Sequence, residues 1–175
     1  MANNQSRLLT TIRADKLLNA VLRPIILKPI YMKYEQAIHS DLDAIKNLLE
    51  FYGLPSNDLN DHLSHFIVAK ESNELVGVGG YEMCQEYALL RSFAVTESHK
   101  GLGIAEHIFK LVEKKAANAG VKSFYLLTDT AIKYFKRFKF SICSRNNAPK
   151  IIRETKQCSD LCPDTATMIC KNLCI

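Results

Sequence analysis

The stretch that decides the fold is residues 89–105, which read LLRSFAVTESHKGLGIA. Its first seven residues are mostly apolar, as in a buried strand. Gly101 and Gly103 follow, and residues 104–119 then carry apolar side chains at helical spacing, up to Gly120 in the place of a C-cap. The stretch therefore predicts a strand, a glycine-rich turn and a long helix.

Such a turn favours a bound anion. Glycine lets the backbone approach a ligand closely, and the unpaired amides at a helix start lie at the positive end of the helix dipole. The turn is not a dinucleotide-binding fingerprint, because the third glycine is missing, and no Gly-Lys-Ser/Thr of a Walker loop is present. We expect the turn to hold a diphosphate.

Around this stretch, strand and helix patterns alternate. The predicted strands are 31–37, 65–71, 74–83, 87–95, 123–127 and 140–145, and the further predicted helices are 39–52, 57–62 and 130–138. Ser40 is the expected N-cap of the first helix, and Ser72-Asn73 the expected tight turn of a hairpin. This order predicts one α/β domain with a mixed sheet over residues 31–175.

Composition narrows the class of protein. The chain has 175 residues, of which 47% are hydrophobic, enough for one buried core. Its apolar runs are too short for a membrane span. The net charge of +5 lies entirely in the first 33 residues, and the rest is balanced. A nucleic-acid-binding surface spread over the fold is therefore not expected.

Residues 1–30 read as a separate leader. Apolar residues recur there at helical spacing among basic ones until Pro24 and Pro29. We expect an amphipathic helix that packs on the domain or on a partner subunit. A transit segment or a membrane-surface helix also fits the composition, and a homodimer stays open.

Six cysteines stand at positions 84, 143, 158, 162, 170 and 174. Without a secretory signal pattern, a reducing cytoplasmic location with free thiols is expected rather than disulfides. The last four cysteines resemble a four-thiolate metal site, but they lack the usual two-residue spacing. We expect no structural metal there, and a soft thiophilic ion remains the alternative.

The turn carries a family resemblance. Lys100, Gly103 and Ala105 match the acetyl-coenzyme A signature Arg/Gln-x-x-Gly-x-Gly/Ala, and over residues 32–170 the chain resembles the GNAT N-acetyltransferase superfamily. The segments GLP at 53–55, ELVG at 74–77, LLRSFAV at 89–95, YLLT at 125–128 and LCP at 161–163 are similar to the arsenic-resistance N-acetyltransferase family. That family is in turn similar to the acetyltransferase domain of N-acetylglutamate synthases.

The resemblance implies a GNAT fold, with a partly splayed mixed sheet flanked by helices, and acetyl-CoA as the cofactor. It implies that backbone amides of the turn hold the diphosphate, that Lys100 adds a positive charge, and that a strand edge lies beside the pantetheine arm. The residues so implied in cofactor binding are Phe93, Ala94, Val95, Lys100, Gly101, Leu102, Gly103, Ile104 and Ala105.

Acetyl transfer to an amine needs a base, and two carboxylates are candidates. Glu82 stands near the end of one predicted strand and Glu86 at the turn that follows it. For each, a solvated strand-end charge is the alternative. Arg91 lies inside an apolar strand, where a charge needs a partner, so it binds either a carboxylate of the acceptor or an internal carboxylate such as Glu82.

One segment departs from the superfamily pattern. Many GNAT enzymes have a tyrosine beside the sulfur in a Phe-Tyr-x-x-x-Gly-Phe segment. Here Phe135 takes the tyrosine place, Lys139 takes the glycine place, and Tyr134 is one position off. This puts the usual proton donor in doubt. Water, Cys143 or a group of the substrate could protonate the thiolate instead, or the thiolate could leave unprotonated, and Phe135 is expected to line the cofactor site.

The acceptor side has weaker signals. Thr128 and Arg153 are expected to contact the acceptor, with Thr155 and Cys162 as further candidates, although the tail over residues 149–168 would equally serve to dock a closing helix or strand.

Together these features predict an N-acetyltransferase that moves the acetyl group of acetyl-CoA to the amine of a small amino-acid-like acceptor by direct attack. A protein or peptide acceptor is one alternative, and a non-catalytic CoA- or arsenite-binding sensor is another.

Overall fold

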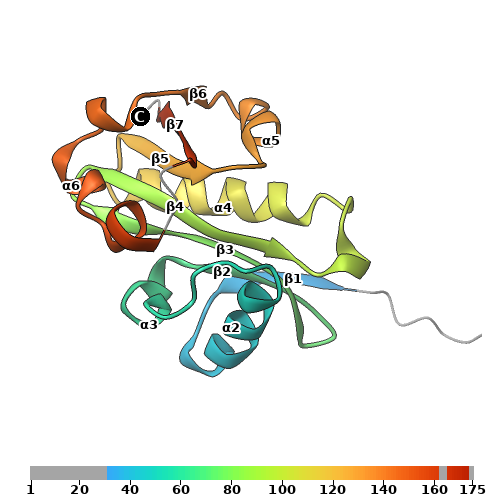
Figure 1. Cartoon of the computed structure of the whole chain (residues 1–175). Coiled ribbons are helices and arrows are strands. Elements are labelled where there is room, and N and C mark those ends of the chain that lie inside the picture. Colours follow the sequence, from blue (N-terminus) through green and yellow to red (C-terminus); the bar gives the residue numbers. More distant parts are fainter. Residues whose placement is uncertain (1–30, 162–164, 174–175) are drawn as a thin grey trace, which may run out of the picture. The chain divides into compact units, whose positions relative to one another are not determined.

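A computed structural model of the chain describes residues 31–161 and 165–173, so the predicted leader lies outside the described residues. One seven-stranded mixed sheet has helices on both faces (Figure 1), which confirms the predicted α/β class with a mixed sheet. Within these ranges, no helix is long and apolar enough to cross a membrane.

The sheet has the strand order β1-β2-β3-β4-β5-β7-β6. Its strands are β1 (Met32–Gln36), β2 (Ile67–Glu71), β3 (Glu74–Cys84), β4 (Tyr87–Val95), β5 (Ser123–Thr128), β6 (Ser141–Ile142) and β7 (Thr167–Asn172). Only β4 and β5 pair in parallel, and the other neighbours are antiparallel.

The helical elements lie between these strands. They are η1 (His39–Asp41), α2 (Leu42–Phe51), α3 (Leu59–His62), η2 (Leu63–His65), η3 (Glu97–His99), α4 (Ile104–Asn118), α5 (Ile132–Lys136), η4 (Arg145–Asn147), α6 (Lys150–Arg153) and η5 (Gln157–Leu161).

Local turn chemistry explains several boundaries. Ser72 and Asn73 both have positive φ, 51° and 70°, which confirms the tight hairpin turn between β2 and β3. The predicted N-cap Ser40 is wrong. The chain enters α2 through the 3₁₀ turn η1, where the Asp41 carboxylate accepts a hydrogen bond of 3.0 Å from the amide of Ile38.

Several elements are shorter than their predictions. The helix expected over 130–138 is only α5, and the strand expected over 140–145 is only the two residues of β6. Lys139 has a φ of 68° and turns the chain between them. The strand expected from residue 65 begins at Ile67, because His65 still belongs to η2.

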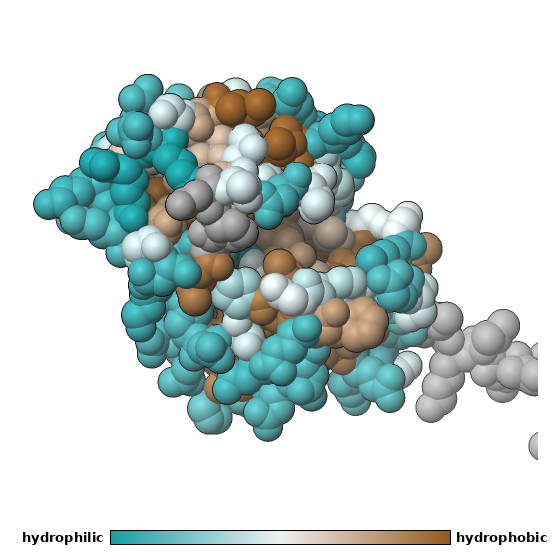
Figure 2. All heavy atoms as spheres, in the orientation of Figure 1, coloured by the Kyte–Doolittle hydropathy of each residue, from teal (hydrophilic) through white to brown (hydrophobic). Residues whose placement is uncertain are grey.

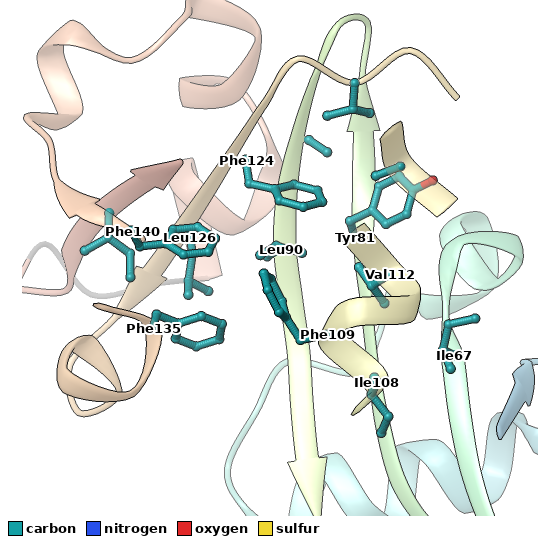
Figure 3. Close-up of a cluster of buried hydrophobic side chains, with 14 of the residues drawn as sticks. Ile67, Tyr81, Leu90, Ile108, Phe109, Val112, Phe124, Leu126, Phe135 and Phe140 are labelled. Atoms are coloured by element: carbon teal, nitrogen blue, oxygen red, sulfur yellow. The ribbon is translucent and has the colours of Figure 1, made fainter. Parts of the chain in front are cut away.

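Each face of the sheet has its own core. The aromatic cluster drawn in Figure 3 lies under α4, and α2 covers the other face, as Figure 1 shows. Both cores pack closely against β3. A Cβ at Gly79 would lie 2.7 Å from the Phe93 ring, and one at Gly80 would lie 2.5 Å from the Phe66 ring. Only glycine allows this close packing.

Candidate functional site

The sheet splits between β4 and β5. The two strands pair only where residues 87–89 face residues 123–125. From Leu90 onward the described part of β4 has no register partner on β5, so the carboxyl half of β4 has a free edge. Backbone donors and acceptors at such an edge can pair with an extended ligand, as with an added strand.

A β-bulge marks the middle of this free edge. Gly80 pairs with Arg91 and Val78 pairs with Ala94, so two residues of β4, Ser92 and Phe93, stand opposite Gly79 alone. Ser92 takes a φ of 60°. Bulges bend a strand and re-aim its side chains. In the cores, Phe93 packs on the α4 face and Ala94 on the α2 face.

The free edge, the start of α4 and one side of α5 enclose a pocket of about 270 Å³. Apolar atoms gather along the middle of the face seen in Figure 2, between hydrophilic margins. The pocket is lined by Phe93, Ala94, Val95, His99, Lys100, Gly101, Ile104, Ala105, Ala131, Tyr134 and Phe135. It thus brings together eight of the ten residues predicted to bind the cofactor.

Of the other two predicted residues, Leu102 is 67% exposed and Gly103 is the residue before α4. Sequence reasoning missed the lining residues His99, Ala131 and Tyr134. The adjacency of Tyr134 to Phe135 was the available signal for the last of these.

The turn before α4 is open at its backbone. Gly101 and Gly103 both have a φ of 79°, and a Cβ at either would meet no protein atom within 4 Å. Gly103 is the N-cap of α4, and within the described residues no side chain accepts a hydrogen bond from the first amides of this helix. A helix of 15 residues therefore presents its first amides to the pocket mouth, where they suit an anion.

Lys100 adds charge at this mouth. Its ammonium lies 2.5 Å from a carboxylate oxygen of Glu97 and 4.7 Å above the ring centre of Tyr52. Glu97 in turn accepts a hydrogen bond from the Tyr52 hydroxyl at 3.0 Å. Because both Lys100 and Glu97 are more than half exposed, the ammonium can turn toward a bound anion.

An ion-pair cluster lies beside the split. The Arg91 side chain is fully buried and donates from both terminal nitrogens to Asp58, at 2.6 and 2.5 Å. Burial alone would raise the pKa of Asp58, but the hydrogen bonds and charge of Arg91 lower it overall. Of the two interpretations of Arg91, the structure has the internal pair, with Asp58 rather than Glu82 as main partner.

Known proteins resemble this chain in sequence and in fold. A family model described as "Acetyltransferase (GNAT) family" matches residues 27–140. The chain belongs to the GNAT acetyltransferase family. Enzymes of this family use acetyl-CoA, so the predicted cofactor is confirmed.

Among curated relatives, the uncharacterized N-acetyltransferase YjcF of Bacillus subtilis (strain 168) is 30% identical over 95 residues, which are 52% of this chain and 68% of that protein.

Solved structures share the fold. N-acetylglutamate synthase from Neisseria gonorrhoeae, complexed with coenzyme A and N-acetyl-glutamate, matches 85% of this chain with a TM-score of 0.72 and 19% identity. This chain spans only 36% of that synthase. Rv2747 from Mycobacterium tuberculosis, in complex with CoA, matches 81% of this chain and 99% of its own with a TM-score of 0.70 and 19% identity.

The GNAT chain places its two candidate bases very differently. Glu82, on β3, is 15% exposed, and its Oε2 lies 3.6 Å from Arg91 and 3.9 Å from His62 Nε2. This Oε2 is buried and accepts no hydrogen bond within the described part of the chain. His62, which sequence reasoning missed, comes from α3, and no motif in the sequence singles it out.

Glu86 lies at the β3–β4 turn, at the opposite end of β4 from the pocket. Its Oε2 lies 2.6 Å from the ammonium of Lys122, and hydrogen bonds from Lys122 and Tyr87 lower the pKa of Glu86. The structure therefore does not bring Glu86 to the pocket, and the solvated ion pair accounts for its charge.

Thr128, Arg153 and Thr155, which were predicted to contact the acceptor, form hydrogen bonds with backbone atoms close to them in the sequence. Thr128 accepts a hydrogen bond of 2.9 Å from the amide of Ala131, the residue before α5. Arg153 is exposed on α6 and donates from Nε to the carbonyl of Ala148 at 3.2 Å. Thr155 is buried and donates to the carbonyl of Ile152, and Cys162 lies outside the described residues. Thr128, Arg153 and Thr155 do not line the cofactor pocket.

Phe135 and Tyr134 are neighbours on α5, and both line the pocket. Phe135 is 4% exposed and packs edge-on against Phe93, with ring centres 6.0 Å apart. Tyr134 lines the pocket, and its hydroxyl is buried with no hydrogen-bond partner in the described residues.

Proposed function

We propose that this chain transfers the acetyl group of acetyl-CoA to the primary amine of a small amino-acid-like acceptor by direct attack. The pocket between the free edge of β4 and the start of α4 is the observation that carries the proposal. It combines a backbone edge for an extended amide-bearing arm with an anion site, which are the two features that coenzyme A requires.

The residues present fit this cofactor. At Gly101 and Gly103 the backbone opens onto space that a Cβ would enter, so a diphosphate can reach the amides of residues 101–105. Lys100 adds a positive charge there. The edge of residues 93–95 pairs with the amides of the pantetheine arm, and Phe135 closes the pocket beside Phe93.

Acetyl-CoA supplies an acetyl group activated as a thioester. The chain's part is to orient the thioester at the bulge and to take a proton from the acceptor's ammonium. The free amine then forms the new C–N bond while the C–S bond breaks, and the departing thiolate takes up the further proton that the nitrogen loses. Glu82 is the base of the proposal, because its Oε2 lacks a hydrogen-bond partner and lies in the cluster beside the split.

Two parts of the proposal rest on the sequence resemblance: that the acceptor is amino-acid-like, and that the chain belongs to the arsenic-resistance branch of the family. The N-acetylglutamate synthase with the same fold is a precedent for such an acceptor. Because Asp58 occupies both terminal nitrogens of Arg91, the exposed Arg153 is the better candidate to meet an acceptor carboxylate. Arg91 would then keep the cluster in place.

The experiment is an acetylation assay with isotopically labelled acetyl-CoA and a panel of amino acids, phosphinic and arsinic amino-acid analogues, polyamines and peptides, read by mass spectrometry. The proposal expects labelled product on amino-acid-like amines only. Labelled peptides would favour a protein acceptor, and cofactor binding without any product would favour a sensor.

A matched pair of glycine variants tests the cofactor site. Gly103 and Gly120 have φ values of 79° and 84°, and a Cβ at either meets nothing within 4 Å. Gly103→Ala and Gly120→Ala therefore carry the same backbone strain. We expect only Gly103→Ala to weaken CoA binding, by about tenfold or more. Equal CoA affinity in the two variants would contradict the proposed diphosphate site.

A further inference from the structure

The Tyr134 hydroxyl is a buried polar group that the proposed function does not use. It accepts and donates no hydrogen bond within the described residues, yet Tyr134 lines the cofactor pocket. Leaving a buried hydroxyl unpaired is costly, so such a group in a ligand pocket points to a partner on the ligand.

Packing holds the Tyr134 ring in place. The ring lies edge-on to Phe135 and to Phe138, each at 5.3 Å between centres, and the Arg137 guanidinium lies 5.8 Å from its centre. Phe135 is itself buried in the aromatic cluster of Figure 3. An anchored aromatic ring loses little entropy on binding, so its hydroxyl is positioned before the ligand arrives.

The position of the Tyr134 hydroxyl along the pocket indicates which part of the cofactor it would contact. Phe135 touches Phe93 beside the bulge, where the thioester would lie. Tyr134 is one residue away, about 100° around the helix. The Arg137 guanidinium, 5.8 Å from the centre of the Tyr134 ring, lies 3.5 Å from Glu106 in the first turn of α4, and Tyr134 shares the pocket wall with Ala105 of that turn. Tyr134 therefore lies between the thioester end and the diphosphate end.

Resting on the proposed function, we propose that the Tyr134 hydroxyl donates a hydrogen bond to an oxygen of the pantetheine arm and so positions the cofactor. Burial first, and then the charge of Glu106, raise the pKa of Tyr134, which keeps the hydroxyl protonated as a donor at neutral pH. Tyr134 is a positioning residue and not the proton donor to the departing thiolate.

The direct test is the affinity of CoA for the wild type, Tyr134→Phe and the control Tyr125→Phe, measured by calorimetry. Tyr125 is a half-buried tyrosine of β5 that packs edge-on against Tyr87 and does not line the pocket. We expect Tyr134→Phe to raise the Kd of CoA by about three- to tenfold and Tyr125→Phe to leave it unchanged. An unchanged Kd in Tyr134→Phe overturns the inference.

A fragment locates the contact. The binding of adenosine 3′-phosphate 5′-diphosphate, which keeps the diphosphate of CoA and lacks the pantetheine arm, should be equal in the wild type and Tyr134→Phe. If Tyr134→Phe weakens this fragment as much as CoA, the hydroxyl contacts the phosphates and the proposed partner is wrong.

Kinetics separate positioning from proton donation. With an acceptor identified, Tyr134→Phe should raise the KM for acetyl-CoA with kcat within about twofold of wild type, whereas loss of a proton donor costs kcat about 100-fold or more. A wild type that fails to bind CoA would instead refute the proposed function, which separates the two failures.

Discussion

Arg91 and Asp58 are 33 positions apart in the sequence, and the two terminal nitrogens of the arginine reach the two carboxylate oxygens of the aspartate at 2.6 and 2.5 Å. The Arg91 side chain is completely buried and that of Asp58 is 9% exposed. This pair ties the start of α3 to the middle of β4, next to the split in the sheet.

Breaking this pair should be severe. Asp58→Asn removes both hydrogen bonds to a carboxylate and leaves the buried Arg91 charge with only the more distant Glu82 at 3.6 Å, and we expect a loss of about 3–5 kcal/mol in the free energy of unfolding in urea. Asp61→Asn, an exposed neighbour on α3, should change it by less than about 0.5 kcal/mol. A loss below about 1 kcal/mol for Asp58→Asn would contradict the prediction.

The pair between Arg91 and Asp58 should also make the stability of the protein fall in acid. Because the pKa of Asp58 is lowered in the folded state, the unfolded chain binds more protons in acid. The pair's contribution is therefore present above the unfolded pKa of about 3.8 and is lost as the pH falls through the folded value. Wild type should lose stability over this range, and Asp58→Asn should show a flatter profile by denaturation at a series of pH values.

Replacing Lys139 with glycine should stabilise the folded protein. It stands in the left-handed region with a φ of 68°, where a side chain costs about 1–2 kcal/mol relative to glycine. We expect Lys139→Gly to raise the free energy of unfolding by about 1 kcal/mol. Lys133→Gly, inside α5, should lower it by a similar amount because glycine disfavours helix. The prediction fails if both variants are destabilised.

His65 should make stability depend on pH near neutrality. Burial lowers the pKa of His65, and the positive charges of His62 and Lys115 lower it further. The unfolded chain then binds more protons at this residue, so stability falls as the pH drops below about 6.5. His65→Gln should flatten the profile between about pH 7 and 5, while the exposed His39→Gln should leave it as in wild type.

Two thiols should resist alkylation. Burial raises the pKa of Cys84 to about 12, and burial together with a hydrogen bond to Cys170 raises that of Cys143 to about 12. Since the thiolate is the nucleophile, iodoacetamide at pH 8 should label both slowly in the folded protein and rapidly in urea. Peptide mass spectrometry reads each site, and equal rates in the two states would be the contrary result.

Cofactor residues were predictable because they are adjacent in sequence. A strand, two glycines and a helix start bring residues 93–105 to one place by local geometry alone, and most of them line the pocket. The fold class followed from the same stretch and from the alternating periods around it. The strand β7, which pairs with both β5 and β6, was not predicted as a strand.

The sequence by itself determined the α/β class, the hairpin at Ser72-Asn73 and the turn before α4, because periodicity and glycine conformation act within a few residues. Only the tertiary structure decided which carboxylates matter. Glu82 and Glu86 are four positions apart, yet the strand brings Glu82 to Arg91 and leaves Glu86 in a surface ion pair with Lys122. Asp58 and His62 join Glu82 because α3 packs beside β3, a long-range contact that no local pattern encodes.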